Sequence, residues 1–304
     1  MAKQIQQLSV KQFEKQFPDD DACKQYLVYQ RWGEVVRCPR CGNEKVWALE
    51  SRPFHWVCKN CETNGYRFSV LVGTIFENTN LPLRQWFRVI HLMLTSKKGM
   101  SALQIMRYMG FGSYNTAWKL CHKIRTALMD GEFRKLMGIV EMDQTYVGGK
   151  AKNRHKDKRG DGSGTGGGIG RGPTGKTAVI GAVQRKGNVV ARVVNSLDGG
   201  SIYSFLRESV SDKVSLLCTD AWKAHRNIGR EFPHAMIDHR AGQYVVGAVH
   251  TNTIEGFWSI LKRGIMGTYH KVSAKYLPLY VAEFQFRYNN RMNEDIFGAA
   301  VAGC

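Results

Sequence analysis

Two pairs of cysteines constrain the fold of this chain more than any other feature. They are Cys38-Pro-Arg-Cys41-Gly and, after 16 intervening residues, Cys58-Lys-Asn-Cys61. Each Cys-x-x-Cys turn can direct two thiolates at one ion at about 2.3 Å, so two such turns predict a closed, structural Zn²⁺ site. Two disulfides or unliganded core thiols are the alternatives, and the paired spacing disfavours both. Strand-like runs at 46–49 and 54–57 lie between the pairs, so residues 31–75 are predicted to form a zinc ribbon.

The charge balance indicates a polyanionic partner. The 304 residues include 44 Lys and Arg against 25 Asp and Glu, a formal net charge of +19 with a pI near 9.7. This excess favours nucleic acid over a membrane surface as the partner. The sequence has no run of about 18 apolar residues, and its first residues lack the apolar stretch of a secretory signal. We therefore expect a soluble cytoplasmic protein.

Helical patterns occupy the region around the ribbon. Residues 1–30 predict a short helical segment, and after Pro82 apolar residues recur at three- and four-residue steps. Ser101 and Gly110 suit the N-cap and C-cap of one helix, and a second helix follows. Region 80–132 is therefore predicted to hold a DNA-binding helix-turn-helix, with an ordinary antiparallel helix pair as the alternative. The polar side of its second helix is expected to carry Lys119, His122, Lys123 and Arg125, of which the lysines and the arginine are predicted to contact DNA.

A basic, glycine-rich stretch at 150–176 is predicted to be a flexible loop that either lies along phosphates or simply stays mobile. Its end, Gly170–Thr177, matches the formula of a phosphate-binding P-loop. A working P-loop leaves a buried strand and enters a helix, whereas residues 177–194 read as a hairpin of two strands. A P-loop ATPase is therefore a disfavoured hypothesis, and the match is attributed to chance.

Residues 136–291 alternate strand-like and helix-like runs and predict a mixed α/β domain. Asp143 lies within its first apolar strand, Asp220 ends a later one, and Glu255 shares the flank of a predicted helix with Lys262. Three such acids suit metal-dependent phosphodiester chemistry, because Mg²⁺ prefers a few carboxylates together with water and substrate oxygens. Surface or salt-bridged acids are the alternative for any single residue.

The order of these motifs resembles that of bacterial insertion-sequence transposases of the DDE class. The motifs are the ribbon, the helix pair, Met-Asp143-Gln-Thr-Tyr-Val-Gly-Gly-Lys, Thr-Asp220-Ala-Trp, His250-Thr-Asn-Thr-Ile-Glu255-Gly-Phe-Trp-Ser-Ile-Leu-Lys262-Arg and Phe286-Arg-Tyr-Asn-Asn-Arg291. More narrowly, residues 30–291 resemble the zinc-ribbon group of insertion-sequence family fifteen ninety-five, with its ISXO-like transposase domain. The resemblance implies a ribonuclease-H-like catalytic domain at 136–291, preceded by a zinc ribbon and a helix-turn-helix region.

The same resemblance implies the residue roles. Asp143, Asp220 and Glu255 would bind Mg²⁺ or Mn²⁺, and Lys262 and Arg263 would contact DNA. Since such enzymes can place Asn in the triad, Asn252 is the alternative third residue. The implied function is a nucleoid-associated bacterial transposase that binds element ends, cleaves them and joins them to target DNA as a homo-oligomer. A non-catalytic DNA-binding protein with the same ribbon and helices, a regulator or decayed transposase, is the alternative.

Overall fold

The computed structural model describes residues 8–62, 64–129, 134–148, 176–222, 225, 228–237, 245 and 249–304. The chain divides into two compact units, one of residues 1–129 with 290–304 and one of residues 130–289. Within the described ranges, no helix combines the length and apolarity that crossing a membrane requires. Most of the glycine-rich stretch, residues 150–175, lies outside the described residues, and so does the P-loop match up to Gly175.

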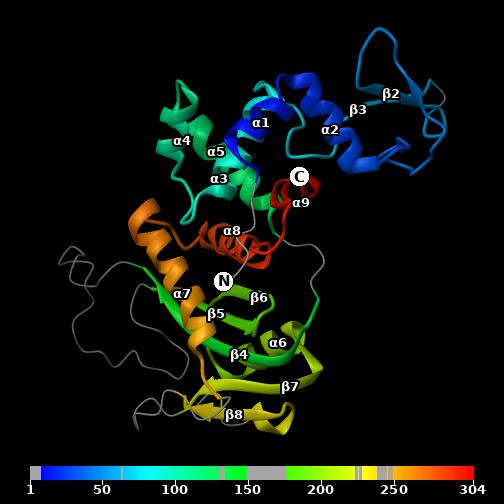
Figure 1. Cartoon of the computed structure of the whole chain (residues 1–304). Helices are drawn as coiled ribbons and strands as arrows, with labels where there is room; N and C mark the ends of the chain where they lie inside the picture. Colours follow the sequence, from blue (N-terminus) through cyan, green and yellow to red (C-terminus); the bar gives the residue numbers. More distant parts are fainter. Residues whose placement is uncertain are drawn as a thin grey trace. The chain divides into compact units, whose positions relative to one another are not determined.

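The first unit contains the helices that surround the cysteine motifs in sequence, together with a small three-stranded antiparallel sheet in the order β1-β2-β3 (Figure 1). Its elements are α1 (Val10–Gln16), α2 (Asp20–Trp32), β1 (Trp47–Ala48), β2 (His55–Cys58), β3 (Tyr66–Ser69), α3 (Leu83–Thr95), α4 (Ala102–Met109), α5 (Tyr114–Ala127) and α9 (Ile296–Ala302). The strands expected between the cysteine pairs are confirmed as β1 and β2, and β3 adds a third.

The helix boundaries follow from capping residues. Ser9 and Gln12 form a reciprocal capping box at the start of α1, and Asp19 accepts a hydrogen bond from the third residue of α2. The N-terminal segment therefore holds two helices where one was expected. Ser101 caps α4 as predicted, and Gly110 ends it with a left-handed φ of +66°.

One prediction about α5 is wrong. Arg125, expected on an exposed basic face, is only 1% exposed, and His122 is also buried. At 100° per residue, Arg125 lies one turn after Cys121 and one turn before Leu128, both of which are buried in the same stripe. The guanidinium therefore faces the interior of the unit, and Arg125 is not a DNA-contacting residue in this structure.

The second unit is built on a mixed five-stranded sheet in the order β6-β5-β4-β7-β8 (Figure 1). Strands β4, β5 and β6 are antiparallel neighbours, β7 is parallel to β4, and β8 is parallel to β7. The elements are β4 (Leu136–Val147), β5 (Thr177–Gln184), β6 (Val189–Val194), α6 (Gly199–Ser209), β7 (Val210–Asp220), a 3₁₀ turn (Ile228–Arg230), β8 (His234–Ile237), α7 (Asn252–Gly264), a π-helical turn (Ile265–Tyr269) and α8 (Leu277–Asn289). Because Thr177 opens a strand and not a helix, the P-loop requirement is not met.

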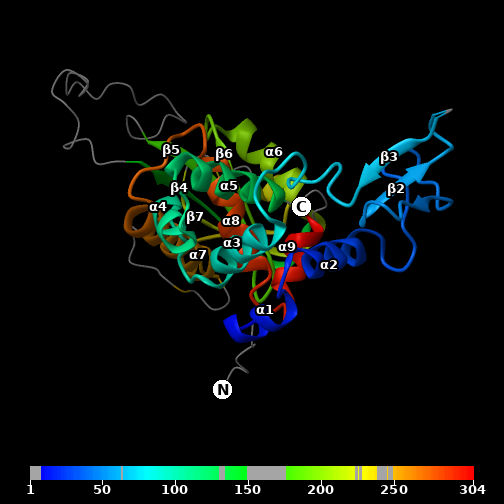
Figure 2. The same ribbon diagram turned by 90° about the horizontal axis from the view of Figure 1, so that it is seen from above.

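Helices cover both faces of this sheet, α6 on one side and α7 with α8 on the other (Figure 2). Strand β5 is buried on both faces: Ile180 packs in the α6 cluster, and Val179 and Val183 pack in the α7–α8 cluster. This explains why β5 reads as a continuous apolar run without alternation. Side chains alternate along β4: Val140 and Met142 face α6, whereas Glu141 and Asp143 face α7.

The outer edge of β6 is paired with side chains of α8. Gln285 accepts a hydrogen bond from the backbone N–H of Ala191 at 2.8 Å, and Asn289, one turn later, exchanges two with the backbone of Val189 at 2.8 and 3.0 Å. Sheet edges present unpaired backbone groups that invite another strand. Here these amide side chains occupy that edge and hold α8 along it.

Candidate active site and zinc centre

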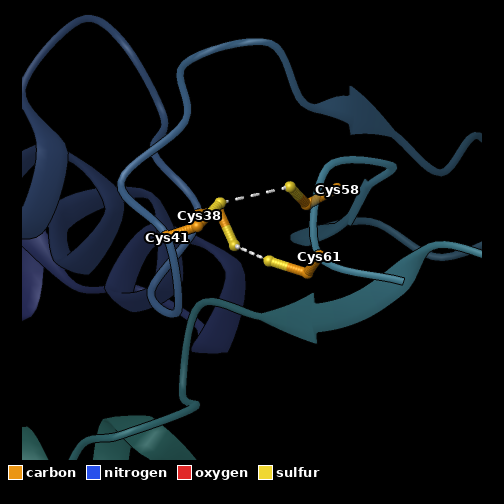
Figure 3. A group of neighbouring side chains, drawn as sticks. All are labelled: Cys38, Cys41, Cys58 and Cys61. Atoms are coloured by element: carbon orange, nitrogen blue, oxygen red, sulfur yellow. Dashed lines mark hydrogen bonds between the residues drawn. The ribbon is translucent and has the colours of Figure 1, made fainter. Parts of the chain in front are cut away.

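The four paired cysteines converge in the first unit, as predicted. Their Sγ atoms all lie within 4.8 Å of one another, with Cys38 and Cys61 3.6 Å apart and Cys41 and Cys58 3.7 Å apart (Figure 3). Four sulfurs around one Zn²⁺ at about 2.3 Å lie about 3.8 Å from one another, so the cluster has the dimensions of a zinc site. All eight cysteines are free thiols, which excludes the disulfide alternative.

The local geometry also favours cation binding. The pKa of Cys41 is lowered to about 6, first by a hydrogen bond from the backbone N–H of Asn43 and then by neighbouring thiols. A thiolate is the form that binds zinc. Gly42 adopts a left-handed φ of +71° directly after the first pair, and its N–H donates to the Cys38 carbonyl at 2.9 Å. With four sulfur ligands no position is left for a substrate, so the site is structural.

Asp143 lies on the α7 face of β4 and is held by a tryptophan. The indole Nε1 of Trp258 donates a hydrogen bond to Asp143 Oδ2 at 3.1 Å. The residue paired with Asp143 on β5 is Gly181, where an added Cβ would lie 2.6 Å from the Trp258 ring. The absence of a side chain at Gly181 therefore makes room for the indole that orients Asp143.

The electrostatics of Asp143 link it to the other two predicted acids. Its pKa is raised to about 6, mainly by burial and further by the charges of Asp220 and Glu255. Asp220 ends β7, the parallel neighbour of β4, and lies two residues beyond the Glu141–Cys218 pairing, level with Asp143. The charges of one acid on the neighbouring strand and one acid on a helix thus act on Asp143.

Asp220 and Glu255 each have a close polar neighbour. The Nδ1 atom of buried His225 lies 2.8 Å from Asp220 Oδ1 and 3.2 Å from the backbone oxygen of Asp220, with which it forms a hydrogen bond. Glu255, in the first turn of α7, is exposed and accepts a hydrogen bond from the hydroxyl of Thr251 at 2.9 Å. Asn252, the alternative third residue, is the first residue of the same helix and is also exposed. The three carboxylates do not all lie within 4.8 Å of one another; among the described residues only the cysteine cluster satisfies that distance.

The predicted basic residues are found on two elements, one in each unit. Lys119 and Lys123 are exposed on α5 in the first unit. Lys262 and Arg263 are exposed in the last turn of α7, two turns beyond Glu255 on the same helix. The apolar stripe predicted for α7 is confirmed, since Ile254, Phe257, Trp258 and Leu261 are all buried.

Sequence reasoning missed the buried acid next to the site. Glu141, on the same face of β4 as Asp143, is 0% exposed and is bonded to the start of α7. Its spacing of two residues from Asp143 is the one sequence signal that could have drawn attention to it. The roles of Trp258 and Gly181 also depend on contacts between distant parts of the chain.

Two domain families match the chain, one in each part of the sequence. Residues 135–289 match the ISXO2-like transposase domain, and residues 18–64 match the transposase zinc-ribbon domain. The chain is 26% identical, over 280 residues, to an uncharacterized protein in transposable element ISH50 of Halobacterium salinarum, covering 90% of this chain and 92% of that protein.

A solved structure also aligns with the chain: the cryoEM structure of the simian T-cell lymphotropic virus intasome in complex with PP2A regulatory subunit B56 gamma. The TM-score is 0.28 at 11% identity, with 62% of this chain and 64% of that chain covered. The chain thus spans less than two thirds of that protein's length, and a TM-score of this size does not establish a shared fold.

Proposed function

The chain belongs to the family of ISXO2-like transposase domains, and from that premise we propose that it is an insertion-sequence transposase that cleaves element ends and joins them to target DNA in a metal-dependent reaction. The observation that carries the proposal is that the charges of Asp220 and Glu255 both raise the pKa of Asp143. Carboxylates that repel one another in a partly buried site favour a divalent cation, which takes oxygen ligands and neutralises their charge.

The topology of the second unit supports a ribonuclease-H-like fold. An antiparallel trio β4, β5 and β6 is followed by helix α6, by β7 parallel to β4, and later by α7. The ribonuclease-H-like fold that the motif resemblance implies has this order: a strand trio, a helix, another strand adjacent to the first, and a final helix that carries the third acid. It puts the first two acids on neighbouring strands and the third on a helix packed against the first strand.

The proposed chemistry assigns a task to each side chain. Asp143, Asp220 and Glu255 would hold Mg²⁺ or Mn²⁺, which when bound would activate the attacking oxygen and stabilise the leaving one. Trp258 orients Asp143, and buried His225 lies beside the Asp220 carboxylate. Lys262 and Arg263 would neutralise phosphates beside the acids.

The reaction needs neither ATP nor a covalent enzyme intermediate. Hydrolysis of a phosphodiester at the element end releases a 3′-hydroxyl, and that oxygen then attacks a target phosphorus and displaces the adjoining 3′-oxygen. Positioning and charge neutralisation are the main contributions that a protein makes to such phosphoryl transfers.

Recognition of the element ends is proposed for the first unit. The match to the transposase zinc-ribbon domain and the formal charge of +19 support DNA as its partner. Helices α4 and α5, joined by a short turn after Gly110, would form the helix-turn-helix, with Lys119 and Lys123 on phosphates. Because two ends are processed together, we expect a homo-oligomer on DNA.

A cleavage and joining assay tests the proposal, with DNA taken from either side of the gene as candidate element ends. We expect cleavage only with Mg²⁺ or Mn²⁺, and its loss in Asp143→Asn and Asp220→Asn with end binding retained. Asp212→Asn, which changes an exposed acid on the same strand as Asp220, serves as the control and should cleave normally. Cleavage that survives both active-site changes would contradict the assignment. End binding by a wild-type protein that never cleaves would favour the non-catalytic alternative.

A further inference from the structure

Glu141 is a buried acid whose carboxylate is fully engaged. It lies in the middle of β4, between β5 and β7, with an exposed fraction of 0%. Its Oε2 accepts hydrogen bonds from the backbone N–H groups of Thr253 at 2.7 Å and Ile254 at 3.1 Å. Its Oε1 accepts from the Thr253 hydroxyl at 2.8 Å and from Arg185 Nε at 2.7 Å. This acid is therefore occupied by protein donors and is not a metal ligand.

The bonds to Thr253 and Ile254 make Glu141 the cap of helix α7. The first N–H groups of a helix have no partner within the helix, and an N-cap Ser or Thr usually supplies one. Here the N-cap is Thr251, but its side chain makes no capping bond, and its hydroxyl donates instead to Glu255 Oε1 at 2.9 Å. The capping role thus passes to an acid 112 positions away in sequence, whose negative charge also suits a helix N-terminus.

Arg185 links Glu141 to the residues that precede α7. Besides its bond to Glu141, it donates from Nη2 to the backbone carbonyl of His250 at 3.1 Å, and His250 Nδ1 lies 3.1 Å from Glu141 Oε1. The arginine follows β5 directly, and its own N–H donates to the Ile139 carbonyl of β4 at 3.0 Å. The residues that lead into α7 are therefore fastened to the same strand as the first turn of the helix.

We propose that Glu141 is a positioning residue that locks the first turn of α7 to β4 and thereby sets the position of Glu255 relative to Asp143. This inference rests on the proposed function. Asp143 lies two residues beyond Glu141 on the same strand face, and Glu255 follows the second of the two capped amides directly. The hydrogen bonds from Thr253 and Ile254 to Glu141 therefore join two short segments of chain. One segment carries Asp143, and the other carries Glu255.

The lock itself is tested by hydrogen–deuterium exchange in the full, zinc-loaded chain. Glu141→Gln keeps the shape of the side chain, but it removes the charge and turns an NH₂ group toward N–H and O–H donors. We expect exchange in the peptide covering 250–258 to rise at least tenfold. Glu283→Gln is the matched control, since Glu283 is also 0% exposed in this unit, where it accepts a hydrogen bond from Tyr269 and pairs with Arg287 of α8. Unchanged exchange in Glu141→Gln, or an equal rise in both variants, would overturn the inference.

The consequence for the site is tested by Mn²⁺ binding, followed by the electron paramagnetic resonance signal of the free ion. We expect the dissociation constant of the site to rise about tenfold in Glu141→Gln and to stay within twofold of the wild-type value in Glu283→Gln. A purely structural role would reduce the fraction of binding-competent protein and leave the dissociation constant unchanged, which would overturn the inference. Wild-type binding that Asp143→Asn does not weaken would overturn the proposed function itself, and this inference with it.

Discussion

A methyl group at Gly181 is expected to disturb Asp143 without touching it. A Cβ at this position would lie 2.6 and 2.8 Å from two Trp258 ring atoms and 3.3 Å from the Val190 carbonyl oxygen. Carbon atoms pack at about 3.5–4.0 Å, so the indole must move by about 1 Å. Trp258 is 3% exposed within the α7–α8 cluster and has little space to move into.

The magnitude for Gly181→Ala follows from two effects. Overpacking a core typically costs about 1–3 kcal/mol. The bond from Trp258 to Asp143, 3.1 Å long, would lengthen beyond hydrogen-bonding range, and a bond to a charged group contributes about 1.5–3 kcal/mol. Allowing for partial relaxation of the core, we expect a loss of about 2–4 kcal/mol in the free energy of unfolding of the second unit.

Urea unfolding of the full chain, followed by Trp fluorescence, measures that loss, and the cleavage assay measures the effect on the site. Trp258→Phe is the companion variant, because it removes the N–H donor and keeps most of the ring. We expect Gly181→Ala to reduce both stability and cleavage, and Trp258→Phe to reduce cleavage with a smaller loss of stability. A Gly181→Ala protein within 0.5 kcal/mol of wild type and with full cleavage would show that Gly181 does not make room for the indole that orients Asp143.

Four further predictions concern other parts of the molecule. Cys41→Ser should reduce bound zinc from about one atom per chain to near zero by mass spectrometry, whereas Cys23→Ser, which changes a buried thiol outside the cluster, should keep it. The double variant Lys119→Ala, Lys123→Ala should keep the fold, and the number of counterions released on DNA binding, measured from its salt dependence, should fall by about two. Unchanged DNA binding in this variant would contradict the phosphate contacts. Arg125→Met, which changes a buried residue, should instead destabilise the first unit. Glu255→Gln should abolish cleavage and Asn252→Ala should reduce it less than tenfold; the reverse order would make Asn252 the third residue. The pKa of His234 is lowered to about 4, mainly by burial and further by the charge of His225, so the unfolded state binds the proton more tightly than the folded state. The contribution of His234 to the free energy of unfolding should therefore be complete above about pH 6.5 and fall by at most about 3 kcal/mol toward pH 4. His234→Gln should flatten the dependence of the free energy of unfolding on pH.

The features that sequence predicted well are those that local patterns determine. The cysteine spacing, the caps at Ser101 and Gly110, and the apolar stripe of α7 each depend on residues a few positions apart, and each is confirmed. The motif resemblance, which depends on the order of short motifs along the chain, is confirmed by the match of residues 135–289 to the ISXO2-like transposase domain.

The features that sequence did not predict depend on contacts between distant residues. Glu141 reads as one more acid in a strand until α7 is packed beside it. Arg125 was expected at the surface because arginine is usually exposed. Its position in the helix, however, places it in the buried stripe of α5. The pairing of Gln285 and Asn289 with the edge of β6 has no local signature, since Gln and Asn on a helix ordinarily indicate a solvated face.

Anomalous diffraction from crystals of the full chain soaked in Mn²⁺ tests most directly whether the three acids form one cation site. We expect a peak at about 2.0–2.3 Å from carboxylate oxygens of both Asp143 and Asp220, with Glu255 turned toward the same region. Mn²⁺ bound elsewhere on the chain, with the carboxylates of Asp143 and Asp220 left without it at saturating concentration, would show that these acids do not form a cation site.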